Sequence, residues 1–155
     1  MNSVLVLCLG NDVLSDDAFG FRLSELLKTR ADLSDRVEVI FAPLGGFQLL
    51  DLLKDRQRVL IVDTIITGNS PPGTLHYFPM GHLTPAHSLT GSHQINLPTA
   101  LDLGRKLGVT MPNTIDVLAV EAQDVYTIGE TLTPPVQAAL EPAIVAVTDW
   151  ISKQL

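Results

Sequence analysis

The sequence predicts an α/β protein, a three-layer α/β/α sandwich with a mostly parallel central sheet. Apolar runs of strand length alternate with segments of helical spacing along the chain, which is the order typical of parallel sheets. The runs at 4–9 and 59–65 are almost continuously apolar, as strands covered by helices on both faces are. The 155 residues, 46% of them hydrophobic, suffice for a single domain with a sizeable core.

In the first half of the chain, short apolar runs indicate strands, and apolar residues at helical spacing indicate helices. The first helix shows this spacing at Phe19, Leu23 and Leu27 and ends with the basic residues Lys28 and Arg30, which suit a helix C-terminus. We expect strands at 4–9, 36–42 and 59–65, and helices at 17–30 and 47–54.

The second half begins with a turn of Gly, Asn, Ser and Pro at 68–73 and contains a long polar loop at 80–92. The terminal helix opens with Thr133 as N-cap and Pro134 at its first position, and Pro142 inside it could kink it. We expect an edge strand at 74–79, a helix at 96–108, a strand at 114–120 and the terminal helix at 134–154.

Charge and composition exclude several kinds of partner. The formal net charge is −7, without a cluster of Lys and Arg, which argues against nucleic acid. No apolar run approaches the roughly 20 residues needed to cross a bilayer, so membrane insertion is not expected. Met1 leads straight into a strand without a signal-peptide pattern, so we expect a cytoplasmic protein. Cys8 is the single cysteine and lies in an apolar strand, where we expect a buried, inert thiol.

Acidic residues follow two of the predicted strands. Asp16 and Asp17 come shortly after the first strand, and Asp63 ends the apolar run at 59–62. In a doubly wound sheet, ligands gather at the carboxyl ends of the strands. If the two strands are neighbours, about 4.8 Å apart, the three carboxylates open onto one crevice. Like charges at such close range repel one another, and a bound cation is the usual remedy.

A structural role for part of this pattern stays open at this point, because Asp16 and Asp17 also stand where they could cap the first helix. Two carboxylates and one imidazole would suit a borderline metal such as nickel, zinc, cobalt or iron. The last of the four histidines lies just ahead of a predicted helix, where its imidazole can be aimed into the crevice. The candidates for the imidazole ligand are His76, His82, His87 and His93.

Several common catalytic motifs are absent. The chain has no dinucleotide-binding glycine pattern, no phosphate-binding lysine loop, no G-x-S-x-G nucleophile and no H-E-x-x-H motif. A receiver-like phospho-acceptor domain is a minor alternative, since such domains also carry an acidic pair after the first strand and an aspartate ending the third. The lysine that ends their last strand is missing here, where Glu121 and Ala122 follow the strand at 114–120.

Four separated blocks of the sequence resemble the hydrogenase maturation endopeptidase family, in order along nearly the whole chain. They are GNDVLSDDAFG within 4–23, VLIVDTI at 59–65, GSHQINL at 91–97, and 119–140 with its LTPPV run. The resemblance implies a single endopeptidase domain over 1–155, a phosphorylase/hydrolase-like α/β/α sandwich. It also implies an activity, the removal of a short C-terminal extension from the large-subunit precursor of a [NiFe] hydrogenase after nickel insertion.

The resemblance further selects the site residues. The family's metal-binding positions fall on Asp17, Asp63 and His93, and these residues with Asp16 are the expected catalytic set. Many relatives carry Glu where this chain has Asp17, which leaves Asp16 as an alternative ligand. Nickel is expected to come with the precursor, and zinc or cadmium could occupy the site in vitro. A nickel-binding maturation chaperone without proteolysis, using the same ligands, is the remaining alternative.

Overall fold

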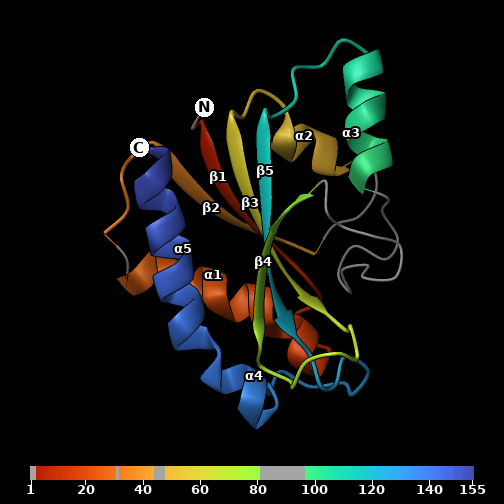
Figure 1. Cartoon of the computed structure of the whole chain (residues 1–155), viewed down its shortest axis with the longest axis vertical. Coiled ribbons are helices and arrows are strands. Elements are labelled where there is room, and N and C mark those ends of the chain that lie inside the picture. The colour runs from red at the N-terminus through yellow and green to blue at the C-terminus, as the bar shows by residue number, and fades with distance from the viewer. Residues whose placement is uncertain (1–2, 31, 44–47, 81–96) are drawn as a thin grey trace.

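The structure is a computed structural model that describes residues 3–30, 32–43, 48–80 and 97–155. A five-stranded sheet runs through the middle of the described part, in the order β2-β1-β3-β5-β4 (Figure 1). The first four strands in this order are parallel, and β4 pairs antiparallel with β5 at the edge. The strands are β1 (Val4–Leu9), β2 (Val37–Ala42), β3 (Arg58–Ile65), β4 (Leu75–Pro79) and β5 (Thr114–Glu121).

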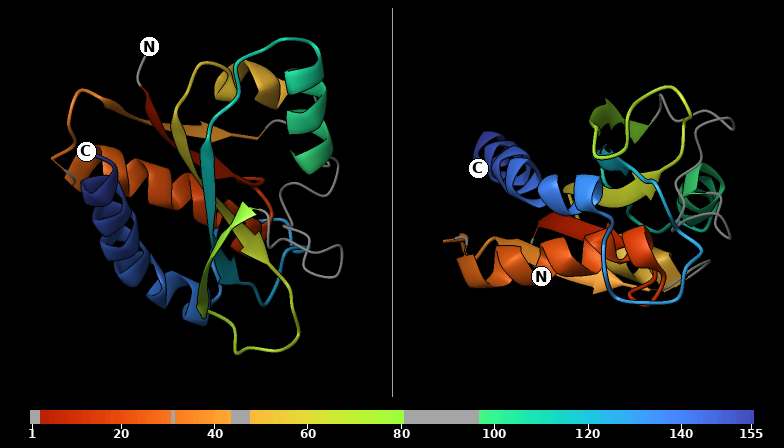
Figure 2. Two further views of the ribbon diagram at one scale, coloured as in Figure 1. Left: turned by 45° about the horizontal axis from the view of Figure 1, so that its top comes forward. Right: turned by 90° about the horizontal axis from the view of Figure 1, so that it is seen from below.

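Helices cover both faces of this sheet. Helices α1 and α5 lie together on one face, and α2 and α3 lie on the other (Figure 1, Figure 2). This arrangement confirms the predicted three-layer α/β/α sandwich. None of the helices in the described ranges has the length and apolar character that a membrane span requires. The helices are η1 (Ser15–Ala18), a 3₁₀ helix, and α1 (Phe19–Arg30), α2 (Gln48–Leu53), α3 (Leu97–Lys106), α4 (Pro134–Ala138) and α5 (Leu140–Gln154).

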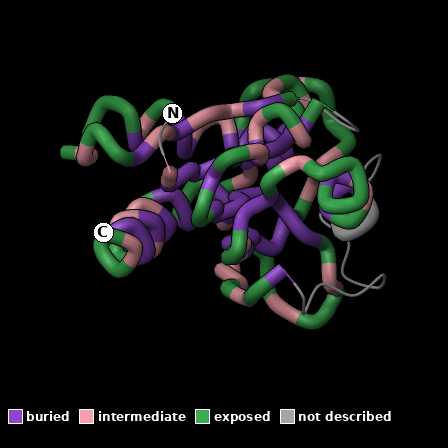
Figure 3. The backbone as a smooth tube through the Cα atoms, turned by 90° about the horizontal axis from the view of Figure 1, so that it is seen from above, coloured by how far each residue is buried: buried purple, intermediate pink, exposed green. Residues whose placement is uncertain are grey.

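Side-chain alternation along the strands creates two hydrophobic cores. On β1, Val4, Val6 and Cys8 pack on the side of α1 and α5, whereas Leu5 and Leu7 pack on the side of α2 and α3. Successive side chains of a strand point to opposite faces, so a strand covered on both sides must be apolar at every position. Figure 3 shows the buried residues gathered in the strands at the centre of the molecule.

Helix α1 packs unusually close to the strand that precedes it. A Cβ atom at Gly20 would lie 2.5 Å from the carbonyl oxygen of Leu9, a distance that no ordinary side chain tolerates. Glycine therefore allows the first turn of α1 to rest on the last residue of β1. This contact fixes η1, which precedes α1, at the carboxyl end of the sheet.

Most elements lie within two residues of their predicted bounds, but the terminal helix differs. Instead of one helix at 134–154, α4 ends at Ala138 and α5 begins at Leu140. Pro142 explains the break, because it has no N–H to donate to the Ala138 carbonyl and its ring would clash with that carbonyl in a continuous helix. Thr133 and Pro134 stand at the N-cap and first position of α4, as predicted. The loop predicted at 80–92 lies, from residue 81 on, outside the described residues.

The strand order places a topological switch point beside β1. Strands β1 and β3 are neighbours, as the prediction of a shared crevice required. The chain winds from β1 to β2 on one side and from β3 to β5 on the other, so its direction reverses between β1 and β3. The carboxyl ends of strands at such a point are where ligands bind in open α/β sheets.

Candidate active site at the carboxyl end of the sheet

The segment after β1 turns back sharply before η1 begins. Gly10 has a φ of 148°, and a Cβ atom there would lie 2.2 Å from the carbonyl oxygen of Asp17. The same oxygen accepts the N–H of Asn11 at 3.1 Å. Only glycine adopts this backbone conformation with another carbonyl so close. The turn therefore places η1, and the two acids it carries, directly beyond the end of β1.

Asp17 is buried at the switch point, with 6% of its surface exposed. Its Oδ2 accepts the backbone N–H of Asn11 at 3.1 Å, and its Oδ1 accepts the hydroxyl of Thr64 at 2.9 Å. A buried carboxylate needs such donors to offset the loss of water. One donor comes from the turn after β1 and the other from β3, so the carboxylate is held in one orientation between the two strands.

Asp63 and Thr64 are consecutive residues near the carboxyl end of β3, and both are buried. Because side chains alternate along a strand, they leave the sheet on opposite faces. The N–H of Thr64 donates to Oδ1 of Asp63 at 2.7 Å, and the hydroxyl of Thr64 donates to Oδ1 of Asp17 at 2.9 Å. Thr64 thus connects two of the predicted site carboxylates through its backbone and its side chain.

Asp16 has different surroundings from its neighbour. It is fully buried, and its carboxylate accepts the backbone N–H groups of Gln123, Asp124 and Thr133 at 2.7–2.9 Å and the Thr133 hydroxyl at 2.9 Å. These four donors match the roughly four lone-pair sites that a carboxylate offers. The geometry therefore argues against Asp16 as an alternative ligand or base, and it assigns this residue to anchoring the loop between β5 and α4.

The helix-capping alternative for the acidic pair does not match the structure either. Asp16 and Asp17 lie in the first turn of η1, but no side chain caps that helix. The N-cap of α4, Thr133, likewise has no side-chain cap, because its hydroxyl donates to Asp16. Both acids are used in contacts between distant segments.

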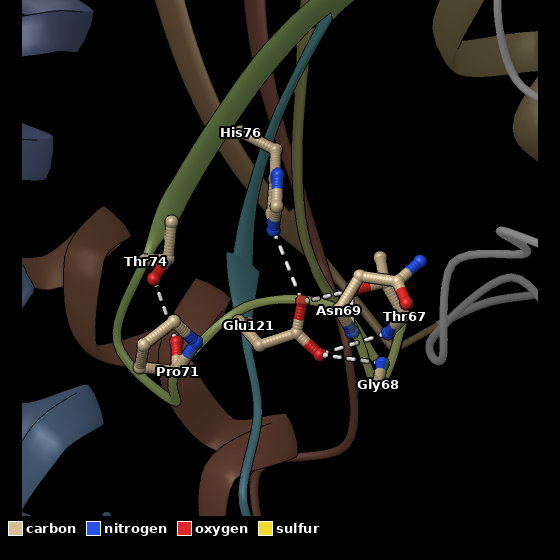
Figure 4. Close-up of polar contacts among 7 residues, drawn as sticks. All are labelled: Thr67, Gly68, Asn69, Pro71, Thr74, His76 and Glu121. Carbon is tan, nitrogen blue, oxygen red and sulfur yellow. Dashed lines mark hydrogen bonds and ion pairs between the residues drawn. The ribbon is translucent and has the colours of Figure 1, made fainter.

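Of the four candidate histidines, only His76 lies within the described residues; His82, His87 and His93 lie outside them. On β4, Nε2 of His76 lies 3.0 Å from Oε1 of Glu121, at the end of β5 (Figure 4). Glu121 also accepts the N–H and hydroxyl of Thr67 at 2.8 and 2.6 Å and the N–H of Gly68 at 3.4 Å. His76 therefore belongs to a second polar cluster, which holds the turn after β3.

The charge state of this second cluster follows from its contacts. Burial raises the pKa of Glu121, but hydrogen bonds from Thr67, His76 and Gly68 outweigh that effect and hold the pKa below its ordinary value of 4.5. Glu121 is consequently ionised at neutral pH although its side chain is only 3% exposed. It supplies a fixed negative charge that joins β4, β5 and the turn after β3.

Cys8 matches its prediction. The residue is fully buried in β1, and burial raises the pKa of its thiol to about 12. A thiol in this state is neither a nucleophile nor a metal ligand at neutral pH. No cysteine-based chemistry can therefore be assigned to the site.

The donor set fits a borderline metal only in part. Asp17 and Asp63 supply oxygen ligands, and a borderline divalent ion also favours imidazole or thiolate. Within the described part of the chain, no three His, Cys, Asp or Glu side chains lie close enough together to hold a metal ion. A complete metal centre needs a further ligand, which His93 or the substrate would have to provide.

Reasoning from the sequence missed Thr64 and Glu121. Both are polar residues near the carboxyl ends of otherwise apolar strands, which is the same signal that identified Asp63. Applied to every strand, this signal would have found both residues. Their partners, Asp17 and His76, lie 47 and 45 residues away in sequence, and no local pattern indicates such contacts.

Fold and site together define a doubly wound α/β protein with buried acids at its switch point. The model of the hydrogenase maturation protease family, HycI, matches residues 21–150. The chain is 33% identical to the hydrogenase 2 maturation protease of Escherichia coli (strain K12) over 144 residues, which cover 91% of this chain and 85% of that protein. The chain belongs to the hydrogenase maturation protease family, and it is therefore an endopeptidase rather than a receiver-like domain.

Solved structures support the same assignment. The hydrogenase maturating endopeptidase HybD from E. coli matches with a TM-score of 0.84 and 29% identity, covering 97% of this chain and 93% of that one. The [NiFe] hydrogenase maturation protease HybD from Thermococcus kodakarensis matches with a TM-score of 0.72 and 20% identity, covering 96% and 98%. The second similarity shows the shared fold.

Proposed function

We propose that this protease acts in the cytoplasm and removes the C-terminal extension from the large-subunit precursor of a [NiFe] hydrogenase after nickel insertion. The observation that carries the proposal is the pair of buried carboxylates, Asp17 and Asp63, joined by Thr64 at the switch point of the sheet. The family match and the relative named for hydrogenase 2 maturation support the choice of substrate.

Nickel belongs to the substrate in this proposal, because the precursor brings it. Asp17, Asp63 and His93 would complete its coordination, so that only a nickel-loaded precursor is held productively. Two carboxylates and an imidazole suit nickel, and zinc or cadmium could take the same ligands in vitro. A metal bound there supplies Lewis-acid polarisation of the scissile carbonyl or a water of lowered pKa.

The protein's own residues orient the reactants and move a proton. Asp17 is the carboxylate that we assign to accept the proton of the attacking water, since Asn11 and Thr64 hold it in place. Asp16 does not share this role, because its lone pairs are occupied by the loop it anchors. With Cys8 buried, the reaction is assigned as direct addition of water to the peptide carbonyl, and Asp17 passes the proton taken from that water to the leaving amine as the peptide C–N bond breaks.

The test compares a nickel-loaded and a nickel-free precursor with the same intact tail. Mass spectrometry should find the loaded precursor shortened and the nickel-free precursor intact. Asp63→Asn should abolish cleavage, whereas Asp102→Asn, a change at an exposed acid on α3, should not affect it. Equal cleavage of the two precursors would reject nickel as the checkpoint. A loaded precursor that stays intact would reject proteolysis of this substrate and favour a chaperone.

A further inference from the structure

The loop between β5 and α4, residues 122–133, holds two large apolar side chains out in solvent. Ile128 is 83% exposed and Tyr126 is 82% exposed, the highest values among the large hydrophobic residues that the structure describes. Val13, 45% exposed, belongs to the adjoining segment, since its carbonyl accepts the N–H of Gly129 at 2.8 Å. We call Val13, Tyr126 and Ile128 the apolar rim.

The backbone that carries the apolar rim is fixed from two sides. Asp16 binds the loop near both of its ends, at Gln123 and Asp124 and again at Thr133. Within the loop, Oδ1 of Asp124 accepts the N–H groups of Tyr126 and Thr127 at 2.9 and 3.0 Å. A surface ordered in advance loses little conformational entropy when a partner binds, which favours its use as a docking surface.

The apolar rim lies next to the proposed active site. Val13 lies four residues before Asp17 in the sequence. The N–H of Ser15, between them, donates to the carbonyl of Gly129 at 2.9 Å. The N–H of Asp16 also donates to the carbonyl of Asp124 at 2.8 Å. A macromolecule whose tail reaches Asp17 would therefore meet these side chains at the same time.

Three acidic residues share the two segments that carry the apolar rim. Asp12, Asp124 and Glu130 lie on the same two segments, and none of them forms an ion pair with any residue that the structure describes. Hydrogen bonds from Thr127 and Tyr126 lower the pKa of Asp124, so it stays ionised. A complementary partner must combine apolar side chains with Lys or Arg. A second copy of this chain, with a net charge of −7, would instead bring like charges together.

We infer that the apolar rim is the docking surface for the hydrogenase large-subunit precursor, which it binds through a segment of apolar side chains flanked by basic ones. The inference rests on the proposed function and adds to it the place and the chemistry of substrate recognition. Tyr126 and Ile128 are the anchors, because they are the most exposed side chains of the apolar rim and aromatic residues such as Tyr are enriched among interface hot spots.

The experiment measures precursor binding and cleavage separately. The double variant Tyr126→Ser/Ile128→Ser should cleave with a KM raised by about 30-fold, the effect typical of losing an interface hot spot, and with kcat nearly unchanged. The nickel-free precursor, which the proposed function leaves uncut, allows binding to be measured without turnover, and the same two substitutions should weaken its binding by a similar factor. Leu107→Ser, at a residue 68% exposed after α3, is the matched control and should change neither quantity.

The remaining outcomes separate the two proposals. If the wild-type protein cleaves the precursor and the double variant has the same KM, the proposed function stands and the docking inference fails. If the wild-type protein neither binds nor cleaves the precursor, both fail. A wild-type protein that sediments as a dimer, with a double variant that sediments as a monomer, would assign the rim to self-association. Binding that does not weaken as salt is raised would contradict the basic character of the partner segment.

Discussion

At the scale of single residues, Thr64 is the side chain that organises the site. Its N–H orients Asp63 and its hydroxyl orients Asp17, at 2.7 and 2.9 Å. The two acids come from different elements, η1 and β3, and this one residue sets their relative orientation. A threonine hydroxyl carries a single proton, so donation to Asp17 uses it fully.

We expect Thr64→Val to impair the reaction without unfolding the protein. Valine has nearly the same shape but no hydroxyl, so Asp17 loses the donor that β3 supplies while β3 keeps its packing. Removing a group that orients a metal ligand typically lowers metal affinity or activity 10–100-fold. We expect a decrease of about this size in kcat and in the Zn²⁺ affinity measured by calorimetry. Thr64→Ser should restore both. A valine variant as active as the wild type would show that Asp17 needs no such support.

Asp16 and Asp17 are adjacent but should respond differently to the same substitution. In the wild type, backbone N–H groups donate to the Asp16 carboxylate. In Asp16→Asn, the side-chain NH₂ would face some of these donors, so we expect a loss of roughly 2–4 kcal/mol in the free energy of unfolding. Asp17→Asn should abolish cleavage, because an amide cannot accept the proton of the attacking water. Urea unfolding and precursor processing, measured on both variants, check this. An Asp16→Asn variant as stable as the wild type would contradict the anchoring role of Asp16.

At the scale of elements, Glu121 joins three segments that the sequence separates. It ends β5, it contacts His76 on β4, and it binds the backbone of the turn after β3. All four parallel strands pair along their length, whereas the turn at 66–74 lies outside the strands. The ionised carboxylate holds this turn against the sheet, and the turn begins three residues after Asp63 in the sequence.

The lowered pKa of Glu121 predicts a dependence of stability on pH. Its pKa is lower in the folded protein than the 4.5 of an ordinary glutamate, so its contribution is complete above that value and is lost as the pH falls through the folded-state pKa. Wild-type stability should therefore drop below about pH 5 more steeply than that of Glu121→Gln. The two stabilities, measured by urea unfolding from pH 7 to pH 3, should converge toward acid. A constant difference over this range would reject the assignment.

At the scale of the whole molecule, the site depends on the winding of the sheet. The polar turn after β1 and the end of β3 meet because the chain reverses direction between these two strands. Helices on both faces leave the carboxyl ends of the strands as the place where loops can collect polar side chains. The acids of the site and the apolar rim consequently occupy the same end of the fold.

The central position of Cys8 makes its reactivity a measure of global unfolding. Because β1 lies inside the sheet and the pKa of the thiol is about 12, an alkylating reagent should label it only when the whole domain opens. The rate of Cys8 labelling, measured by mass spectrometry, should be low in buffer and should increase with urea in parallel with unfolding. Proteolytic activity should survive the reagent in buffer, as it should in a Cys8→Ala control. Rapid labelling of the native protein with loss of activity would contradict the buried position.

The sequence by itself determined the layers and most of the elements. Continuously apolar strands and helical spacing are local patterns that follow directly from burial on two faces or one, so β1, β3 and α1 could be predicted from them. Asp63 could be found in the same way, as a charge ending an apolar strand. The break before α5 was predicted only as a kink in one helix, because the position of Pro142 indicates a disturbance but not the residue at which the helix restarts.

Only the tertiary structure shows which groups each acid contacts. Asp16 and Asp17 are the same residue type at adjacent positions, and no local pattern separates an anchor from a candidate catalytic group. Their hydrogen-bond partners differ: Asp16 accepts hydrogen bonds from groups 107–117 residues away, and Asp17 accepts one from Thr64, 47 residues away. Hydrogen bonds between distant segments depend on how the strands are ordered in the sheet, and that order is a property of the folded chain as a whole.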